Sequence, residues 1–387
     1  RPLLATLAHV TRTRLPGREV AVTDLDGDRR DDLVLLDSTR TQITLVDHAL
    51  RPLGSERMPA PVSHLLPGSA RALLHDGHTL RLRELTGERR VLWSQRGLSK
   101  PYTAALLDPD DDGQPDLYLG LEPPTRRFAV LPDLALAAPD APLRTAHAST
   151  QASNSDVEGL AAADLDGDGT RELVAAVSAW SAYDLRIYQP AADGLQLRAA
   201  RRLGRVAGVA VLRGADGRQR VAVAKDDAYP NREVFPTPPH TGEPAGVYLL
   251  RWTGRELVAD GFVPFPRADG RAAVQVGRFM QAGDLDGDGL DDLVIAAAHD
   301  LHPTQQRDLA LVLRQHSDGE FTMVALGGLV PVGLFTADDD PARELLAFAT
   351  GLPDELLVLG AGDDLLDPLP RPVRTLVEPP AELAAPE

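Results

Sequence analysis

The 387-residue chain contains no cysteine, which excludes disulfide bonds, thiolate metal ligands and cysteine nucleophiles. Lysine occurs only at Lys100 and Lys225, and aromatic residues make up 4% of the sequence. No apolar run is long enough to cross a bilayer, so we expect a chain that is not integral to a membrane. The formal net charge of −17 argues against nucleic acid as a partner, because phosphate groups require a basic surface.

The remaining composition is that of a globular protein, with 43% hydrophobic and 25% charged residues. By length, the chain suits one large domain or two to three domains of average size. The sequence opens on Arg1 rather than Met, which leaves open the removal of an upstream targeting segment.

Aspartate is concentrated in short clusters, and each cluster runs directly into an apolar, strand-like segment. The segment 163–174 reads ADLDGDGTRELV. Similar segments are TDLDGDRRDDLVLL from Thr23, LDPDDDGQPDLYLG from Leu107 and GDLDGDGLDDLVIA from Gly283. A fifth, eroded copy starts at Thr336 and reads TADDDPARELLAFA. The recurrence indicates an internal repeat.

The spacing of these clusters predicts seven repeat units. The anchor positions are Asp24, Asp108, Asp164, Asp284 and Thr336, and the spacings between them are 84, 56, 120 and 52 residues. Each of the two long gaps contains a degenerate copy without the carboxylates, one starting at Leu65 and one at Val209. Repeats of about 40 to 70 residues are typical of propellers and solenoids.

Each unit divides into four short strand-like segments, which in the unit around Asp284 span 274–283, 292–298, 308–315 and 320–327. The pattern predicts an all-β fold, a seven-bladed β-propeller with four-stranded antiparallel blades. We expect a single domain over residues 1–378 and a Pro-rich tail at 379–387. The last unit lacks an obvious fourth strand, so we expect residues 3–10 or 374–379 to complete it and close the ring.

The spacing of the carboxylates predicts about four Ca²⁺ sites, because four carboxylates within nine residues repel one another unless a cation is bound. Positions 1, 3, 5 and 9 of each cluster offer carboxylates and position 7 offers a main-chain carbonyl, which suits the hard oxygen shell of calcium. The predicted ligands are Asp24, Asp26, Asp28, Arg30 and Asp32; Asp108, Asp110, Asp112, Gln114 and Asp116; Asp164, Asp166, Asp168, Thr170 and Glu172; and Asp284, Asp286, Asp288, Leu290 and Asp292.

These clusters resemble the FG-GAP/VCBS repeat family, the calcium-loop propellers of integrin α-subunit heads and of many bacterial secreted proteins. The resemblance rests on DLDGDGTRELVAA and DLDGDGLDDLVIA, which are close to the family's Asp-x-Asp-Gly-Asp-Gly-x-x-Asp-Leu core. It implies that each calcium loop joins the first and second strands of a blade.

Two clusters depart from the glycine at position 6, where the chain turns through positive φ. Arg29 occupies this position in the first cluster, and we expect that site still to bind calcium. Gly113 retains the glycine in the second cluster. Pro341 occupies the position in the fifth cluster and cannot reach positive φ, so we expect that site to be empty.

Enlarged loops after the second strands of three consecutive units form a candidate ligand site on the face opposite the calcium loops. Its aromatic and histidine residues are Trp180, Tyr183, Tyr229, His240, His299 and His302. Three interpretations stay open for this rim: loops that simply tolerate insertions, a metal held by the histidine pair, and a Tyr/His acid–base pair acting on a polysaccharide.

The sequence favours a non-enzymatic, calcium-stabilised propeller that binds a protein or glycan partner outside the cytoplasm, whether secreted, periplasmic or surface-attached. Trp93, Trp180 and Trp252 are the three tryptophans and do not recur blade by blade, which favours a protein partner over repeated sugar sites. The alternative is a polysaccharide lyase or hydrolase that uses the rim opposite the calcium loops. A third possibility is a module of a larger assembly.

Overall fold

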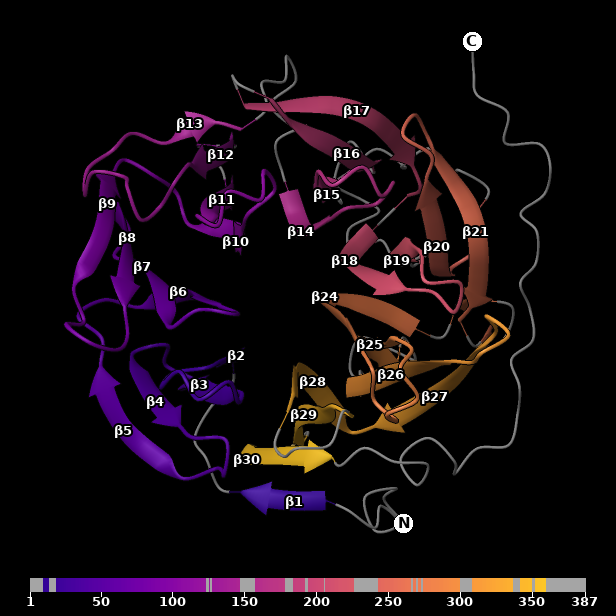
Figure 1. Ribbon diagram of the computed structural model, residues 1–387. Coiled ribbons are helices and arrows are strands. Elements are labelled where there is room, and N and C mark those ends of the chain that lie inside the picture. The colour runs from indigo at the N-terminus through magenta and orange to yellow at the C-terminus, as the bar shows by residue number, and fades with distance from the viewer. Residues whose placement is uncertain are drawn as a thin grey trace.

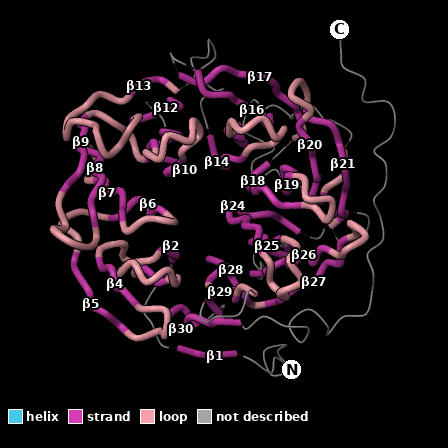
Figure 2. Tube along the Cα trace, viewed as in Figure 1, coloured by secondary structure: helices cyan, strands magenta, loops and turns pink. Residues whose placement is uncertain are grey.

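The protein forms a closed ring of seven four-stranded sheets arranged around a central axis (Figure 1). The computed structural model describes residues 10–13, 19–122, 125, 127–146, 157–177, 184–191, 194–204, 206–225, 243–265, 267–268, 271–272, 274–299, 308–336, 342–349 and 352–359. In these ranges the chain is strand and loop throughout (Figure 2), and no helix in them has the length and hydropathy needed to cross a membrane. The predicted all-β, seven-bladed propeller is therefore confirmed.

Six blades each take four consecutive strands, numbered here in chain order. Blade 1 contains β2 (Glu19–Thr23), β3 (Asp32–Leu36), β4 (Gln42–Val46) and β5 (Pro52–Arg57). Blade 2 contains β6 (Val62–Leu66), β7 (Arg71–His75), β8 (Thr79–Glu84) and β9 (Val91–Arg96). Blade 3 contains β10 (Pro101–Leu107), β11 (Asp116–Leu121), β12 (Arg127–Leu131) and β13 (Arg144–Thr145).

The second half of the ring follows the same plan. Blade 4 contains β14 (Val157–Ala163), β15 (Glu172–Val177), β16 (Asp184–Ala191) and β17 (Gly194–Arg202). Blade 5 contains β18 (Val206–Arg213), β19 (Gln219–Lys225), β20 (Gly246–Trp252) and β21 (Leu257–Pro264). A small hairpin of β22 (Arg267–Ala268) and β23 (Arg271–Ala272) precedes blade 6, which contains β24 (Val274–Gly283), β25 (Asp292–His299), β26 (Asp308–Gln315) and β27 (Phe321–Gly327).

Blade 7 joins the two ends of the described chain. It contains β28 (Leu329–Phe335), β29 (Glu344–Ala349) and β30 (Leu352–Leu359), and its fourth strand is β1 (Val10–Thr13), which pairs antiparallel with β30. The N-terminal strand thus begins where the expected stretch 3–10 ends. Residues 374–379 lie outside the described part of the chain. The pairing fastens the ring between segments that are far apart in sequence (Figure 1).

The two degenerate units are complete blades. The copy starting at Leu65 falls in blade 2, and the copy starting at Val209 falls in blade 5. Both retain four paired strands although their first connecting loops lack the acidic cluster. The strand pattern therefore specifies a blade without help from the carboxylates.

The hydrophobic core lies between neighbouring blades. One cluster joins Ala210 and Leu249 of blade 5 to Ile295 and Leu311 of blade 6. The second strands are covered on both faces, which explains continuous apolar runs such as the fully buried β3. The fourth strands form the outer rim, and β5 is largely exposed. The first strands line the axis, so the loop that follows each first strand begins at the innermost strand of its blade (Figure 1).

Candidate functional site

Four acidic loops occupy the same place in blades 1, 3, 4 and 6, between the first and second strands, as the resemblance implied. In each loop, position 1 directly follows the first strand and position 9 is the first residue of the second strand. The position 9 residues are Asp32, Asp116, Glu172 and Asp292. The sheet therefore fixes both ends of every loop.

The Asp-Gly pattern folds each loop around the carboxylate at position 1. In blade 6, the two oxygens of Asp284 accept the N–H groups of Gly287, at 2.7 Å, and of Gly289, at 2.9 Å. Both glycines have φ near +80°, at 76° and 85°, a conformation that costs an ordinary side chain about 1–2 kcal/mol. The loops of blades 1 and 4 repeat these bonds, and in blade 1 Arg29 adopts the left-handed conformation with φ 71°.

The position 9 carboxylate is buried beneath the loop in blades 1, 4 and 6. It accepts the N–H of the leucine at position 2, for example Leu165 N to Glu172 Oε2 at 2.9 Å and Leu285 N to Asp292 Oδ2 at 3.0 Å. Burial raises the pKa of Glu172 and of Asp292 to about 7, and the carboxylates at positions 3 and 5 add to the rise. These buried groups need nearby positive charge to stay ionised.

Three carboxylates converge in each of these loops. Ligand oxygens from positions 1, 3 and 9 lie within 4.8 Å of one another, in the sets Asp24, Asp26 and Asp32; Asp164, Asp166 and Glu172; and Asp284, Asp286 and Asp292. Asp32 Oδ1 is buried and has no hydrogen-bond partner within the described ranges. Closely spaced hard oxygens with an unpartnered buried member fit a divalent cation such as Ca²⁺.

Positions 5 and 7 make a local turn beside these three carboxylates. The N–H of Thr170 donates to Asp168 Oδ1 at 2.7 Å, and equivalent bonds join Arg30 to Asp28, Gln114 to Asp112 and Leu290 to Asp288. In blades 1, 4 and 6 the position 5 carboxylate lies outside the converging set. Coordination by the position 5 carboxylates and the position 7 carbonyls stays a prediction.

The blade 3 loop is arranged differently, because Pro109 at position 2 has no N–H group. Asp116 at position 9 accepts the N–H of Asp133, at 2.9 Å, as Asp292 accepts that of Gln315, and it accepts the hydroxyl of Tyr118, at 3.0 Å, in place of a position 2 N–H. The converging carboxylates here are Asp108, Asp110 and Asp112. Asp116 lies outside this converging set, and its role as a ligand stays a prediction.

An arginine contacts one of the sites. Arg314 of β26 forms an ion pair with Asp286 at position 3 of the blade 6 loop, and the Asp286 side chain is 1% exposed. Asp292 at position 9 also accepts the N–H of Gln315, at 2.8 Å. Of the four loops, the one in blade 6 is thus tied most closely to the third strand of its own blade.

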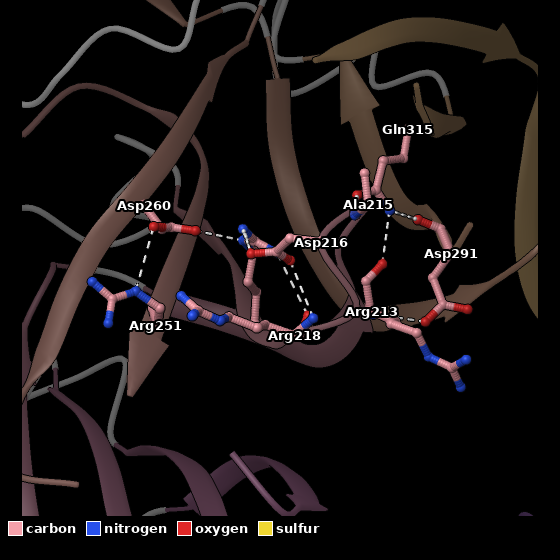
Figure 3. Close-up of polar contacts among 9 residues, drawn as sticks. Arg213, Ala215, Asp216, Arg218, Arg251, Asp260, Asp291 and Gln315 are labelled. Carbon is pink, nitrogen blue, oxygen red and sulfur yellow. Dashed lines mark hydrogen bonds and ion pairs between the residues drawn. The ribbon is translucent and has the colours of Figure 1, made fainter. Parts of the chain in front are cut away.

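The residue at position 8 links the loops of blades 1, 4 and 6 to the preceding blade. Asp291 Oδ2 in blade 6 accepts the N–H of Arg213 in blade 5 at 2.7 Å, and Gln315 bridges Ala215 of blade 5 to the Asp291 carbonyl (Figure 3). In blade 4, the N–H of Arg171 donates to the carbonyl of Pro109 in blade 3 at 3.3 Å. The loops therefore contribute to the contacts between blades.

Blade 7 is held by the acidic loops on both sides of it. The N–H of Arg343 donates to the Asp284 carbonyl of blade 6 at 2.8 Å, and the N–H of Thr336 donates to Asp31 Oδ2 of blade 1 at 3.0 Å. Pro341 and its neighbours 337–340 lie outside the described residues. The expectation that the fifth cluster binds no calcium stays a prediction.

The candidate ligand rim cannot be placed in the same way. Trp180, Tyr183, Tyr229, His240 and His302 lie outside the described residues. His299 is the last residue of β25, and only its main chain is described. The rim and its three interpretations stay predictions.

Near the axis, the structure brings together a polar cluster that the sequence did not indicate. The Arg278 guanidinium lies 5.4 Å from the centre of the Tyr102 ring and 3.2 Å from Glu158 Oε2. Nε2 of His64 lies 3.3 Å from the Tyr102 carbonyl, and burial lowers the pKa of this imidazole to about 4. Register shifts at the starts of β10, β14 and β24 re-aim these side chains, and such bulges leave no clear mark in a sequence.

Comparison with known proteins connects the loops to a family. The family model described as FG-GAP repeat matches residues 276–305, which include the acidic loop of blade 6 and most of the strands beside it. Comparison with curated proteins found no similar sequence.

Several solved structures have a similar fold. The crystal structure of BBS1N in complex with ARL6DN, soaked with lead, has a TM-score of 0.56 and 12% identity, covering 90% of this chain and 94% of that one. The mercury-soaked crystal of the same complex gives a TM-score of 0.55 and 13% identity, covering 91% and 95%. The WD40 domain of Neurospora crassa Pan2 has a TM-score of 0.48 and 9% identity, covering 89% of each chain. The matched repeat in blade 6 and the seven four-stranded blades together fit an FG-GAP β-propeller.

Proposed function

We propose that this chain is a calcium-stabilised, non-enzymatic propeller that binds a partner protein outside the cytoplasm. One observation carries the proposal: carboxylates converge in the same loop of four blades, and in three of them one carboxylate is buried. A fold stabilised by packing alone has no need of this repeated arrangement. The fold, the converging acids and the net charge support the separate parts of the proposal.

The calcium part of the proposal rests on electrostatics. Two unit charges 4 Å apart repel each other by about 4 kcal/mol at the effective dielectric constant near a protein surface. Each loop places three carboxylates within 4.8 Å, and in blade 6 Arg314 offsets part of this charge through its ion pair with Asp286. With calcium bound, Asp32, Glu172 and Asp292 would supply the buried oxygens and the carboxylates at positions 1 and 3 the outer ones. The ion would supply the compensating charge.

The same sites support the proposed location. Loops that offer few fixed carboxylates and lie at the solvent edge suit the weak calcium affinities of extracellular modules, about 10⁻⁴ to 10⁻³ M. Calcium reaches such concentrations outside the cytoplasm. We therefore place the protein in a secreted, periplasmic or surface-attached setting.

The binding part of the proposal rests on the fold. A propeller presents two broad faces and a rim on a rigid scaffold, and the similar BBS1N structure was solved in a complex with ARL6DN. Such an analogy supports binding of a protein but does not identify the partner. The net charge of −17 would steer a basic surface toward this chain.

Calorimetric titration of the chelator-treated chain with CaCl₂ tests the calcium part directly. We expect saturable binding at several sites and a lower melting temperature in excess chelator. Asp164→Asn should remove one site, whereas Asp318→Asn should leave the titration unchanged, because Asp318 is exposed in the turn after β26. Absence of binding heat together with an identical melting curve in chelator would exclude the proposal.

A further inference from the structure

Two neighbouring cavities open where the outer edge of blade 3 meets blade 4. The first has a volume of about 290 Å³ and lies between the blade 3 acidic loop, β13 and the start of β17. The second, of about 250 Å³, is lined by the segment that connects β12 to β13. Both cavities are lined by Pro132, Asp133 and Arg144, so they form one continuous surface, which we call the blade 3 surface.

This surface has a fixed shape. The N–H of Leu195 in β17 donates to the Ala146 carbonyl at 2.9 Å, which holds β17 beside the end of β13 (Figure 1). The segment between β12 and β13 is attached to blade 2, because Trp93 Nε1 donates to the Ala141 carbonyl and Ser94 N to the Pro139 carbonyl, both at 2.7 Å. The cavities therefore lie on a scaffold that is already in place before any partner arrives.

The first cavity is acidic. Asp110, Asp116 and Asp133 line it, and Arg144 is the only basic residue among those that line either cavity. The Asp133 carboxylate has no hydrogen bond or ion pair among the described residues, whereas both oxygens of Asp116 are occupied. A cation held by Asp110 and its neighbours would leave Asp116 and Asp133 opposed by Arg144 alone. The cavity thus suits a positively charged group.

The second cavity is apolar. Its lining includes Leu131, Ala137 and Pro142, with Leu136 at its edge. Leu136 is 78% exposed, more than any other large hydrophobic residue of the described chain. Together with the apolar lining of the second cavity, Leu136 offers an aliphatic side chain of a partner a surface to pack against.

We propose that the blade 3 surface binds a segment of a partner protein in which a lysine or arginine adjoins an aliphatic residue. The basic side chain enters the first cavity and pairs with Asp133, and the aliphatic side chain packs against Leu136 in the second. The three aspartates repel an acidic segment. This inference rests on the proposed function and specifies its binding surface and the chemistry of its partner.

The test is selection of random seven-residue peptides, displayed on phage, against the full chain in calcium. We expect enrichment of peptides with a basic residue beside an aliphatic one. Fluorescence anisotropy with the enriched peptide should show about tenfold weaker binding to Asp133→Asn, which removes one charge-assisted hydrogen bond. Asparagine tolerates the left-handed main chain of Asp133, where φ is 47°, so the variant retains the fold.

Further variants test the contribution of each cavity to binding and control for misfolding. Leu136→Ser should weaken binding several-fold, and Arg144→Gln should strengthen it, because that change removes the one like charge that faces the ligand. A gain of affinity cannot come from misfolding. Asp140→Asn is the matched control, since Asp140 is exposed on the same segment and lines neither cavity.

The possible outcomes distinguish failure of the proposed blade 3 surface from failure of the proposed function. Enrichment of acidic peptides, or equal binding to Asp133→Asn and to the unaltered chain, would overturn the blade 3 surface while leaving a protein-binding propeller intact. Failure to enrich any peptide would overturn it as well. The calcium titration on the same samples reports on the calcium sites independently of all these results.

Discussion

The buried carboxylate of Asp292 offers the sharpest test of the calcium sites. Its side chain is fully buried, and its two oxygens accept the N–H groups of Leu285 and Gln315. Asp292→Asn preserves the shape of the side chain but replaces one carboxylate oxygen, a hydrogen-bond acceptor, by an NH₂ group, a donor. The new NH₂ group then faces the N–H of either Leu285 or Gln315. We expect this mismatch to cost about 1–3 kcal/mol, partly offset because the variant buries no negative charge.

The rise in melting temperature on adding calcium should depend on how many sites bind the ion. A ligand that binds only the folded chain, at a hundredfold excess over its Kd, adds about 2.7 kcal/mol of stability per site. An unfolding entropy of about 2.1 cal/mol/K per residue gives about 0.8 kcal/mol/K for 387 residues, so one site is worth about 3 °C in melting temperature. Four equal sites are worth more than about 10 °C.

The assay is differential scanning fluorimetry of the unaltered chain, Asp292→Asn and the control Asp318→Asn, each in excess calcium and in excess chelator. Calcium should raise the melting temperature of Asp292→Asn by about 3 °C less than that of the other two proteins. An identical calcium response in all three would refute the assignment of Asp292 as a ligand. An equal drop in melting temperature in calcium and in chelator would show that Asp292 acts through its hydrogen bonds alone.

Three further substitutions test separate features. Arg29→Gly should raise the melting temperature in chelator by about 1–2 °C, because it relieves a left-handed conformation worth about 1–2 kcal/mol; a lower value would contradict the strain at this φ of 71°. Arg314→Gln should tighten calcium binding in blade 6 about fivefold by calorimetry, because Arg314 competes for Asp286; unchanged affinity would show that the ion pair does not oppose the cation. Burial lowers the pKa of His64 from 6.5 to about 4, so the unfolded chain takes up the proton first and stability should fall as pH drops from about 6.5 to about 4. His64→Gln should reduce that pH dependence in urea unfolding, by up to about 3 kcal/mol; an unaltered pH profile would contradict it.

The propeller was predictable because each blade is specified locally. The predicted segments 274–283 and 308–315 coincide with β24 and β26, since apolar alternation and flanking turn residues mark both ends of these strands. The acidic loops were predictable for the same reason: the left-handed main chain needed to wrap Asp284 requires Gly287 and Gly289 at fixed offsets. Loop geometry of this kind can be predicted from the sequence because it depends on residues a few positions apart.

Contacts between blades were harder to predict. The segment between β12 and β13 is positioned by hydrogen bonds from Trp93 and Ser94 of blade 2 to its Ala141 and Pro139 carbonyls, and no motif in the sequence marks these bonds. The pairing of Arg278 with Glu158 joins blades 4 and 6 across the axis and depends on bulges. Neither contact follows from a pattern within one blade.

The links at position 8 give a physical reason for acidic loops in a ring. The loops of blades 1 and 6 hold blade 7 through the Asp31 carboxylate and the Asp284 carbonyl, and a bound cation would offset the repulsion among the carboxylates of these loops. Blade 7 is also the blade that depends on β1, a strand from the other end of the chain. Calcium in the flanking loops would therefore stiffen the two supports of the blade whose closure costs the most chain entropy.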